Sequence, residues 1–186
     1  MRDGDKYYRW SPDSKWLLVG WSRTLSNSEA LLVSADGKER RNLTNSGYRD
    51  YRPKWVNGGK QMLWFSNRNG LKSYATSGST QSDVYSMFFT QDAWDEFQLS
   101  KEEYDLKKEM EKAKNVEEKK EKDEKEEDKE KEKEEKVKDL TFDWEGLEDR
   151  KARLTIHSSS LGDAVLSKDN QTLYYLARFE KGMNLW

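Results

Sequence analysis

The chain has no cysteine, only two prolines, a single histidine and no long apolar run in its 186 residues. Without cysteine it can form neither disulfide bonds nor thiolate metal sites, and this lack fits the periplasm and the cytoplasm equally well. No apolar stretch approaches the roughly 18–20 residues of a membrane-spanning helix, and residues 1–5 contain no apolar signal core. We therefore expect no membrane span and leave the compartment open between periplasm and cytoplasm.

Charges of the two signs nearly cancel, with 34 lysine and arginine residues against 36 aspartate and glutamate residues. This balance provides no basic face, so we expect no nucleic-acid partner. Charged residues make up 38% of the chain, yet 8 Trp, 9 Tyr and 6 Phe are far more aromatics than a disordered chain carries. Nearly all the excess charge lies in residues 101–138, and nearly all the aromatics lie outside them. The chain is thus a folded part of roughly 140 residues that a polar segment interrupts.

One pattern of ten residues occurs three times along the chain. It consists of a large apolar residue, a polar turn of about four residues, a Lys or Gln, and an aromatic or aliphatic run; the copies are Trp10–Val19, Trp55–Trp64 and Leu166–Tyr175. Pro12 presets the backbone of the first turn, and Gly58 and Gly59 supply positive φ angles in the second. The flanking aromatic and aliphatic runs suit buried strands, so each copy predicts a β-hairpin.

The spacing of these copies indicates a repeat with one insertion. The first two copies start 45 residues apart, which fits the ~40–45 residues of a four-stranded propeller blade. The second and third copies start 111 residues apart, and a second marker, Arg41–Thr44, recurs as Ala152–Thr155 at the same offset. Two independent markers in one register predict an insertion of about 66 residues between the third and fourth strands of the second blade.

The predicted fold class is all-β: a partial β-propeller of about two and a half four-stranded blades with a long charged helical insertion. Residues 1–98 are assigned to blade 1 and most of blade 2, residues 99–140 to the insertion, and residues 141–186 to the end of blade 2 and the start of blade 3. The expected strands are Tyr8–Trp10, Trp16–Ser22, Ala30–Ala35, Glu39–Thr44, Arg52–Val56, Gln61–Ser66, Val84–Phe89, Arg150–Thr155, Asp163–Leu166, Thr172–Arg178 and Asn184–Trp186. Since propellers close with 4–8 blades, we expect a fragment of a larger protein, with its remaining blades and domains as partners.

The insertion is mostly lysine and glutamate and contains neither proline nor glycine. Glu/Lys pairs four residues apart favour a helix, so a solvated helix or a mixture of helix and disorder is expected. Its first part offers a weak docking face formed by Tyr104, Leu106, Met110, Ala113 and Val116. A partner-binding arm or a coiled coil stays open as the alternative, although no heptad seam continues through the polar half.

The sequence assigns no catalytic, cofactor-binding or metal-binding residue, and no cofactor. His157 is the only histidine, and it lies beside three serines in a loop between blades without a nucleophile elbow. No glycine-rich phosphate cradle is present. Two acidic pairs, Asp3 with Asp5 and Asp92 with Asp95, could hold a cation, but at this composition such pairs are expected by chance. The tryptophans are expected to pack between blades; they are Trp10, Trp16, Trp55 and Trp64.

Two motifs carry a resemblance to known proteins. The Trp10–Lys15 turn, with Arg41–Thr44 closing the blade, resembles the TolB-like (WD40-like, PD40-type) propeller repeats of TolB, prolyl-oligopeptidase relatives and tricorn proteases. Phe142–Arg150 is similar to the Asp-x-x-Gly-hydrophobic-Glu-x-Arg segment of tricorn-type proteases and their bacterial homologues. The chain departs from the repeat pattern at Ser14, where a turn glycine is usual, and in its third copy, which lacks proline.

The resemblance to the tricorn family implies a large serine peptidase. In such an enzyme, propellers precede a PDZ domain and a catalytic domain of the C-terminal-processing-protease type, and the propeller filters or steers peptides and unfolded proteins. None of the family's catalytic residues has a matching position in this sequence, so the chain is expected to be non-catalytic by itself. A TolB-like protein-binding module of the cell envelope remains the alternative, and the propeller of an α/β-hydrolase peptidase is a third possibility.

Overall fold

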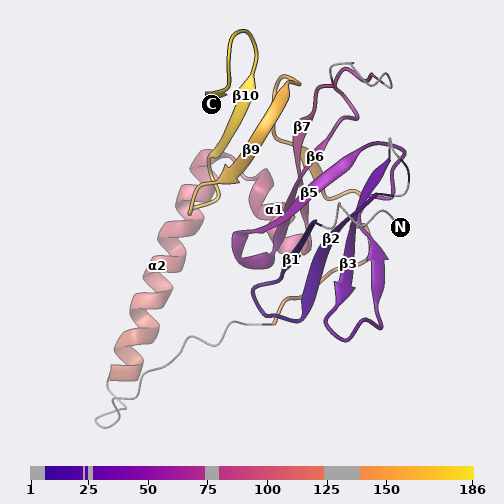
Figure 1. The fold of residues 1–186 in the computed structure, drawn as a ribbon. Helices are drawn as coiled ribbons and strands as arrows, with labels where there is room; N and C mark the ends of the chain where they lie inside the picture. Colours follow the sequence, from indigo (N-terminus) through magenta and orange to yellow (C-terminus); the bar gives the residue numbers. More distant parts are fainter. Residues whose placement is uncertain (1–6, 23, 25–26, 74–79, 124–138) are drawn as a thin grey trace.

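A computed structural model describes residues 7–22, 24, 27–73, 80–123 and 139–186, and the side chains of residues 115–123 are not described. The strands form three antiparallel sheets in which each strand pairs with the next along the chain (Figure 1). The first sheet contains β1 (Tyr7–Trp10), β2 (Trp16–Ser22), β3 (Ser28–Ser34) and β4 (Arg40–Asn42). The second contains β5 (Asp50–Val56), β6 (Gln61–Ser66), β7 (Asp83–Phe88) and β8 (Lys151–Arg153), and the third β9 (Ser160–Leu166), β10 (Leu173–Arg178) and β11 (Asn184–Leu185).

The predicted insertion lies between the third and fourth strands of the second sheet. β7 pairs directly with β8, with Tyr85 opposite Arg153, although more than sixty residues separate the two strands in sequence. Helix α1 (Gln91–Gln98) and helix α2 (Lys101–Asp123) occupy the connection, and η1 (Asn57–Gly59) forms the β5–β6 turn. The sequence did not predict α1, and residues 124–138 of the predicted insertion lie outside the described residues. No helix within the described ranges is long and apolar enough to cross a membrane.

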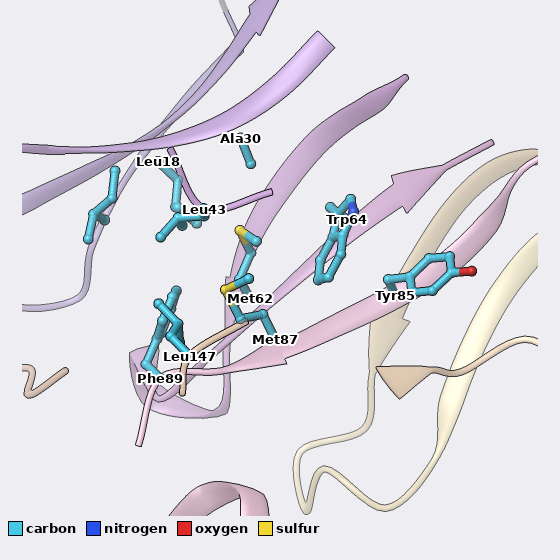
Figure 2. Close-up of a cluster of buried hydrophobic side chains, with 10 residues drawn as sticks. Leu18, Ala30, Leu43, Met62, Trp64, Tyr85, Met87, Phe89 and Leu147 are labelled. Carbon is cyan, nitrogen blue, oxygen red and sulfur yellow. The ribbon is translucent and has the colours of Figure 1, made fainter. Parts of the chain in front are cut away.

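The first and second sheets pack face to face around the larger core cluster (Figure 2). Alternate residues of a strand point to opposite faces. Leu18 and Leu32 therefore point from the first sheet toward the second, where Met62 and Trp64 meet them. All four side chains are at most 1% exposed. We call the face of a sheet that points to the next sheet along the chain its forward face, and the opposite face its back face.

The second and third sheets repeat this contact. Leu63, Phe65 and Val84 on the forward face of the second sheet pack with Ala164 of the third, and half-buried Leu173 and Tyr175 join them on its back face. The middle sheet thus lies between the other two, and the described sheets form an open stack rather than a closed ring (Figure 1). Regular structure among the described residues is mostly β-strand, and the stacking of the sheets is consistent with successive propeller blades.

A Ser-x-Asp turn recurs in the first and third copies of the hairpin motif and between β3 and β4, whereas η1 forms the turn of the second copy. In the β1–β2 turn, Ser11 Oγ donates to Asp13 Oδ1, which also accepts the Lys15 N–H. The same bonds form between Ser34, Asp36 and Lys38, and between Ser167, Asp169 and Gln171. The residue after each aspartate has a positive φ of 59–73°, supplied in turn by Ser14, Gly37 and Asn170. Short polar residues therefore adopt the left-handed conformation that a glycine provides in the usual motif.

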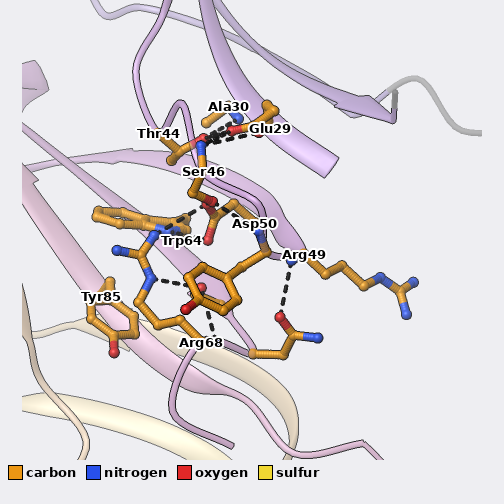
Figure 3. Close-up of polar contacts among 12 residues, drawn as sticks. Glu29, Ala30, Thr44, Ser46, Arg49, Asp50, Trp64, Arg68 and Tyr85 are labelled. Atoms are coloured by element: carbon orange, nitrogen blue, oxygen red, sulfur yellow. Dashed lines mark hydrogen bonds and ion pairs between the residues drawn. The ribbon is translucent and has the colours of Figure 1, made fainter. Parts of the chain in front are cut away.

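A second repeated contact explains the Leu-Thr marker that defines the offset of 111. Thr44 Oγ1 donates to the Glu29 carboxylate at 2.7 Å and accepts the Ala30 N–H at 3.0 Å (Figure 3). Thr155 Oγ1 donates to Asp83 at 2.9 Å and accepts the Val84 N–H at 3.2 Å. Both carboxylates are at most 1% exposed. The threonine of each marker thus joins the end of the fourth strand to the start of the third.

The tryptophans follow the prediction of packing between sheets with one exception. Trp64 is 1% exposed in the first core, and Trp16 and Trp55 pack against the same cluster. Trp10, on the back face of the first sheet, is 52% exposed, so in this chain the prediction is wrong for that residue. Leu17 lies opposite Trp10 across the β1–β2 pair, which places both on the outer face of the stack.

Candidate functional site

The segment between the insertion and β8 holds α1 against the second sheet. Arg150 is 4% exposed, and its guanidinium donates to the carbonyl oxygens of Phe88, Asp143 and Glu145. The Asp143 carboxylate accepts the N–H of Gln91, the first residue of α1, at 2.8 Å. Gly146 has a φ of 65°, which allows the tight turn between Asp143 and Arg150. These residues of the predicted tricorn-like motif are therefore structural: they fix the helix and the return of the chain.

The end of the insertion is held against the β1–β2 turn. The Leu140 N–H donates to Asp13 Oδ2 at 2.8 Å, and Lys15 forms an exposed ion pair with Asp139. Gly59 has a φ of 91°, a conformation that favours glycine, and a Cβ at this position would lie 2.6 Å from a Leu140 methyl group, so a side chain there would displace that leucine. The chain is thereby returned to the same end of the second sheet from which α1 departs.

Two adjoining cavities lie where the helices meet the β5–β6 and β9–β10 turns. Their volumes are about 430 and 690 Å³, and both are lined by Asn57, Ala93, Glu96, Tyr104 and Asn170. We call the two together the helix-side groove. In the smaller cavity polar and apolar residues contribute equally to the lining, and the apolar part includes Phe88, Phe97, Leu99, Leu154, Leu166 and Leu173. A depression of this size with apolar side chains and amide groups in its lining suits an apolar side chain and the polar backbone of a bound chain.

Aromatic side chains build one wall of the helix-side groove. Phe97 is 44% exposed, and its ring lies 4.6 Å from that of Phe88 and 5.8 Å from that of Trp94, between centroids. Tyr104 on α2 donates its hydroxyl to the Asp169 carbonyl at 3.3 Å, which ties the helix to the third sheet. The groove is therefore formed by three parts of the chain that are far apart in sequence.

Paired charges border the larger cavity. Glu96 accepts a hydrogen bond from Lys107 at 2.7 Å and lies 3.8 Å from Lys108. Burial of Glu96 favours its neutral form, but the Lys107 hydrogen bond and both ammonium charges outweigh it and hold the pKa of Glu96 below its usual value. Glu96 is thus ionised at neutral pH and balanced by its lysines, so this border offers no strong net charge to a ligand.

A more polar cavity of about 490 Å³ lies between β4 and the segment that leads into β8. Arg41 stacks over the Trp144 ring at 4.1 Å in this cavity, and Glu148 and Lys151 also line it. Burial, followed by the charge of Arg68, lowers the pKa of Lys151. Arg68 itself is bound to the fully buried Asp50, which also accepts the Trp64 indole N–H at 3.1 Å (Figure 3). This network joins the loop after β6 to the core, a structural role.

The residues considered as catalytic or metal-binding do not come together. His157 is exposed in the bend between β8 and β9. Asp92 and Asp95 lie on α1, where Asp95 accepts a hydrogen bond from Gln91. No group of three or more potential metal ligands occurs among the described residues, and Asp3 and Asp5 lie outside them.

Sequence reasoning missed the helix-side groove because it missed α1. The available signal was Thr90, which caps the helix by accepting the Ala93 N–H, followed by apolar residues at helical spacing through Phe97.

Comparisons with known proteins indicate the type of fold and nothing further. No family model matches the sequence, and no curated protein matches it. Among solved structures, a crystal structure of the tricorn protease matches with a TM-score of 0.52 and 8% sequence identity. The match covers 94% of this chain and 15% of that chain, so this chain spans a small part of its length. At this identity the likeness supports a propeller-type fold alone.

Proposed function

We propose that this chain is a non-catalytic propeller segment of a tricorn-like serine peptidase, in which it binds and steers extended peptide substrates. Three successive blade-like sheets carry the proposal, because their stacking agrees with the likeness to the tricorn protease in fold. The repeated Ser-x-Asp turns and the Arg150 anchor further support TolB-like repeats and the tricorn-type peptidase family. Catalysis would then reside in other parts of the peptidase.

The helix-side groove is the place where this chain would hold a peptide. Its apolar wall at Phe97 and Leu173 can accept an aromatic or large aliphatic side chain. Amide groups of Asn57, Asn170 and Gln171 line the same cavity; Asn170 donates to Asn57 Oδ1 at 2.9 Å, and the Gln171 amide can pair with the backbone of an extended chain. Such contacts with any suitable side chain and with the backbone favour broad recognition, as steering of diverse peptides requires.

The test is binding of short unstructured peptides, measured by fluorescence anisotropy. A labelled ten-residue peptide with two Phe residues should bind, and a Gly/Ser peptide of equal length should bind at least about tenfold more weakly, a difference of about 1.4 kcal/mol. Phe97→Ser should weaken binding of the Phe peptide about tenfold, whereas Leu71→Ser, the same kind of change at a 58% exposed leucine outside the groove, should leave it unchanged. Mass spectrometry should find the peptide intact after incubation.

Two results would count against this function. Equal affinity for the two peptides, or equal binding by the Phe97→Ser variant, would remove the groove as a peptide site. Binding of a folded envelope protein, with no binding of extended peptides, would favour the TolB-like module of the cell envelope instead.

A further inference from the structure

The edge of the second sheet at β8 is free to pair with a further strand. β8 is the last strand in the order of this sheet, and no strand within the described residues pairs with its other side. The Leu154 N–H donates to a carbonyl of β7 at 2.8 Å, and the Arg150 carbonyl accepts an N–H of β7 at 3.0 Å. Backbone groups of alternate residues point to opposite sides of an antiparallel strand. Those of Lys151 and Arg153 therefore point away from β7, toward the free edge.

A cavity lies on each face of the sheet beside this edge. We call the polar cavity between β4 and the segment that leads into β8 the β4–β8 cavity, and Lys151 lines it. Lys151 lies opposite Met87, whose side chain is in the first core, so this cavity is on the back face of the second sheet. Leu154, which packs against the second core, lines the helix-side groove on the forward face. Because Lys151 and Leu154 belong to one short stretch of chain, a single extended peptide can reach both cavities.

Two cations of the β4–β8 cavity have free N–H groups. The Lys151 ammonium is half-buried and forms no hydrogen bond or ion pair within the described residues. Burial and the charge of Arg68 lower its pKa, and they outweigh the attraction of Glu148. The Arg41 guanidinium lies over the Trp144 ring and donates no hydrogen bond to another described residue. Glu148 is the one acidic residue in the lining, so the cavity carries a net positive charge.

A carboxylate side chain suits this lining, because ammonium and guanidinium groups form charge-assisted hydrogen bonds with carboxylates. The Trp144 ring, which stacks on Phe142 at 4.9 Å between centroids, holds the Arg41 guanidinium in place. In a strand added antiparallel to β8, the residue opposite Lys151 shares its face, and the preceding residue, opposite Ala152, points to the other face. An acidic residue in the first position would meet the ammonium while an apolar residue in the second enters the helix-side groove.

We propose that an extended peptide adds to the free edge of β8 as an antiparallel strand, with an acidic side chain in the β4–β8 cavity and the preceding apolar side chain in the helix-side groove. The proposal rests on the proposed function, because it takes the helix-side groove as the apolar part of the peptide site. It adds a preferred sequence, an apolar residue followed by aspartate or glutamate. The backbone of any peptide can pair with the free groups of Lys151 and Arg153, and the two side chains then select among peptides.

Fluorescence anisotropy with matched peptides provides the test. Each labelled ten-residue peptide has both ends blocked and a central Phe in a Gly/Ser sequence, followed by Asp in one peptide and by Asn in the other. Blocked ends leave the Asp side chain as the only carboxylate. The Asp peptide should bind about fivefold more tightly, because its carboxylate gains charged partners that the amide does not. This preference should fall as the salt concentration rises from about 0.05 to about 0.5 M.

Three variants locate the carboxylate. Lys151→Met removes the ammonium and should bind the Asp peptide no better than the Asn peptide, while its affinity for the Asn peptide stays that of the unmodified chain. Glu148→Gln removes the opposing charge and should increase the preference about twofold. Lys181→Met, the same change at an exposed lysine outside both cavities, is the matched control and should keep the preference. Equal binding of the two peptides by the unmodified chain, or an undiminished preference in Lys151→Met, would overturn the proposal.

N-methylation of the peptide backbone tests the strand addition itself. The residue opposite Lys151 exchanges both backbone hydrogen bonds with it, whereas the N–H of the residue opposite Ala152 points away from β8. Methylation at Asp should therefore weaken binding about tenfold, and methylation at Phe should change it less than about twofold. The reverse order, or no effect at either position, would overturn strand addition.

The outcomes separate this inference from the proposed function. Equal binding of the Asp and Asn peptides, together with weaker binding of both by Phe97→Ser, would leave the helix-side groove as a peptide site and overturn only the acidic preference. No binding of any Phe-containing peptide would overturn the proposed function and this inference with it.

Discussion

Replacing the marker threonines by valine should destabilise the fold strongly at both sites. Valine keeps the volume of Thr155 but removes the hydroxyl that donates to Asp83 and accepts the Val84 N–H. Val84 is fully buried, so its N–H would be left without a partner, at a cost of about 1–3 kcal/mol. Asp83 would lose one bond to a charged group, worth about 1.5–3 kcal/mol, but would keep those from Arg153 and Ser158. Because these terms overlap, we expect a loss of about 2–4 kcal/mol for Thr155→Val.

Thr44→Val removes the equivalent bonds to Glu29 and the Ala30 N–H and should cost a similar amount. Glu29 keeps the Ser46 N–H as a donor at about 3.0 Å. The assay is urea unfolding followed by tryptophan fluorescence at one fixed protein concentration, with Thr→Ser at each site as the control. Serine retains the hydroxyl and should cost less than about 1.5 kcal/mol. A loss below about 0.5 kcal/mol for either valine variant, or serine variants as unstable as the valine ones, would refute the reasoning.

Three further predictions concern the anchor, a turn and the insertion. Arg150→Met should cost about 2–4 kcal/mol in urea unfolding, because three carbonyl groups lose a buried charged donor; a loss below about 1 kcal/mol would mean that the anchor is dispensable. Hydrogen bonds from the Ser167 hydroxyl and the Gln171 N–H lower the pKa of Asp169, so its contribution is present above the unfolded pKa of about 3.9 and is lost as the pH falls through the lower folded pKa. Asp169→Asn should therefore be less stable than the unmodified chain at pH 7 and converge with it toward pH 2, and a pH-independent difference would contradict this. Replacing residues 105–136 by a Gly/Ser linker of about ten residues should change the unfolding free energy by less than about 1 kcal/mol, since the described side chains that it removes, those of residues 105–114, include no buried one and form partly exposed ion pairs; loss of the cooperative thermal transition would show that α2 is part of the folded unit.

The strands could be predicted because their signals are local. Alternating apolar residues and a short polar turn fix a hairpin without reference to the rest of the chain, and all three hairpins form where the repeat places them. Boundaries are less well predicted: β4 and β8 contain three residues each, shorter than the expected Glu39–Thr44 and Arg150–Thr155. Both end before the Leu-Thr marker, where the threonine side chain takes over the bonding to the third strand.

The helix-side groove could not be predicted, because its parts are far apart in sequence. Helix α1 depends on Asp143, about fifty residues later, for a bond to its first N–H. The sequence does not distinguish Arg150 from the many exposed charged residues. Its burial becomes evident only in the structure, where carbonyl groups surround its guanidinium. The division of the chain into domains and the role of the insertion stay predictions.

The central claim is that the chain after the insertion completes the second sheet, and an engineered disulfide tests it most directly. Ser86 and Ala152 lie opposite each other in the β7–β8 pair, where antiparallel Cα atoms are about 4.5–5.5 Å apart, within the range of a disulfide. The chain has no cysteine of its own, so Ser86→Cys with Ala152→Cys gives a single possible bond. Mass spectrometry after mild oxidation should find this pair linked in most molecules and the control pair, Ser86→Cys with Leu154→Cys, largely unlinked. An unlinked first pair, or equal linkage of both pairs, would contradict the account.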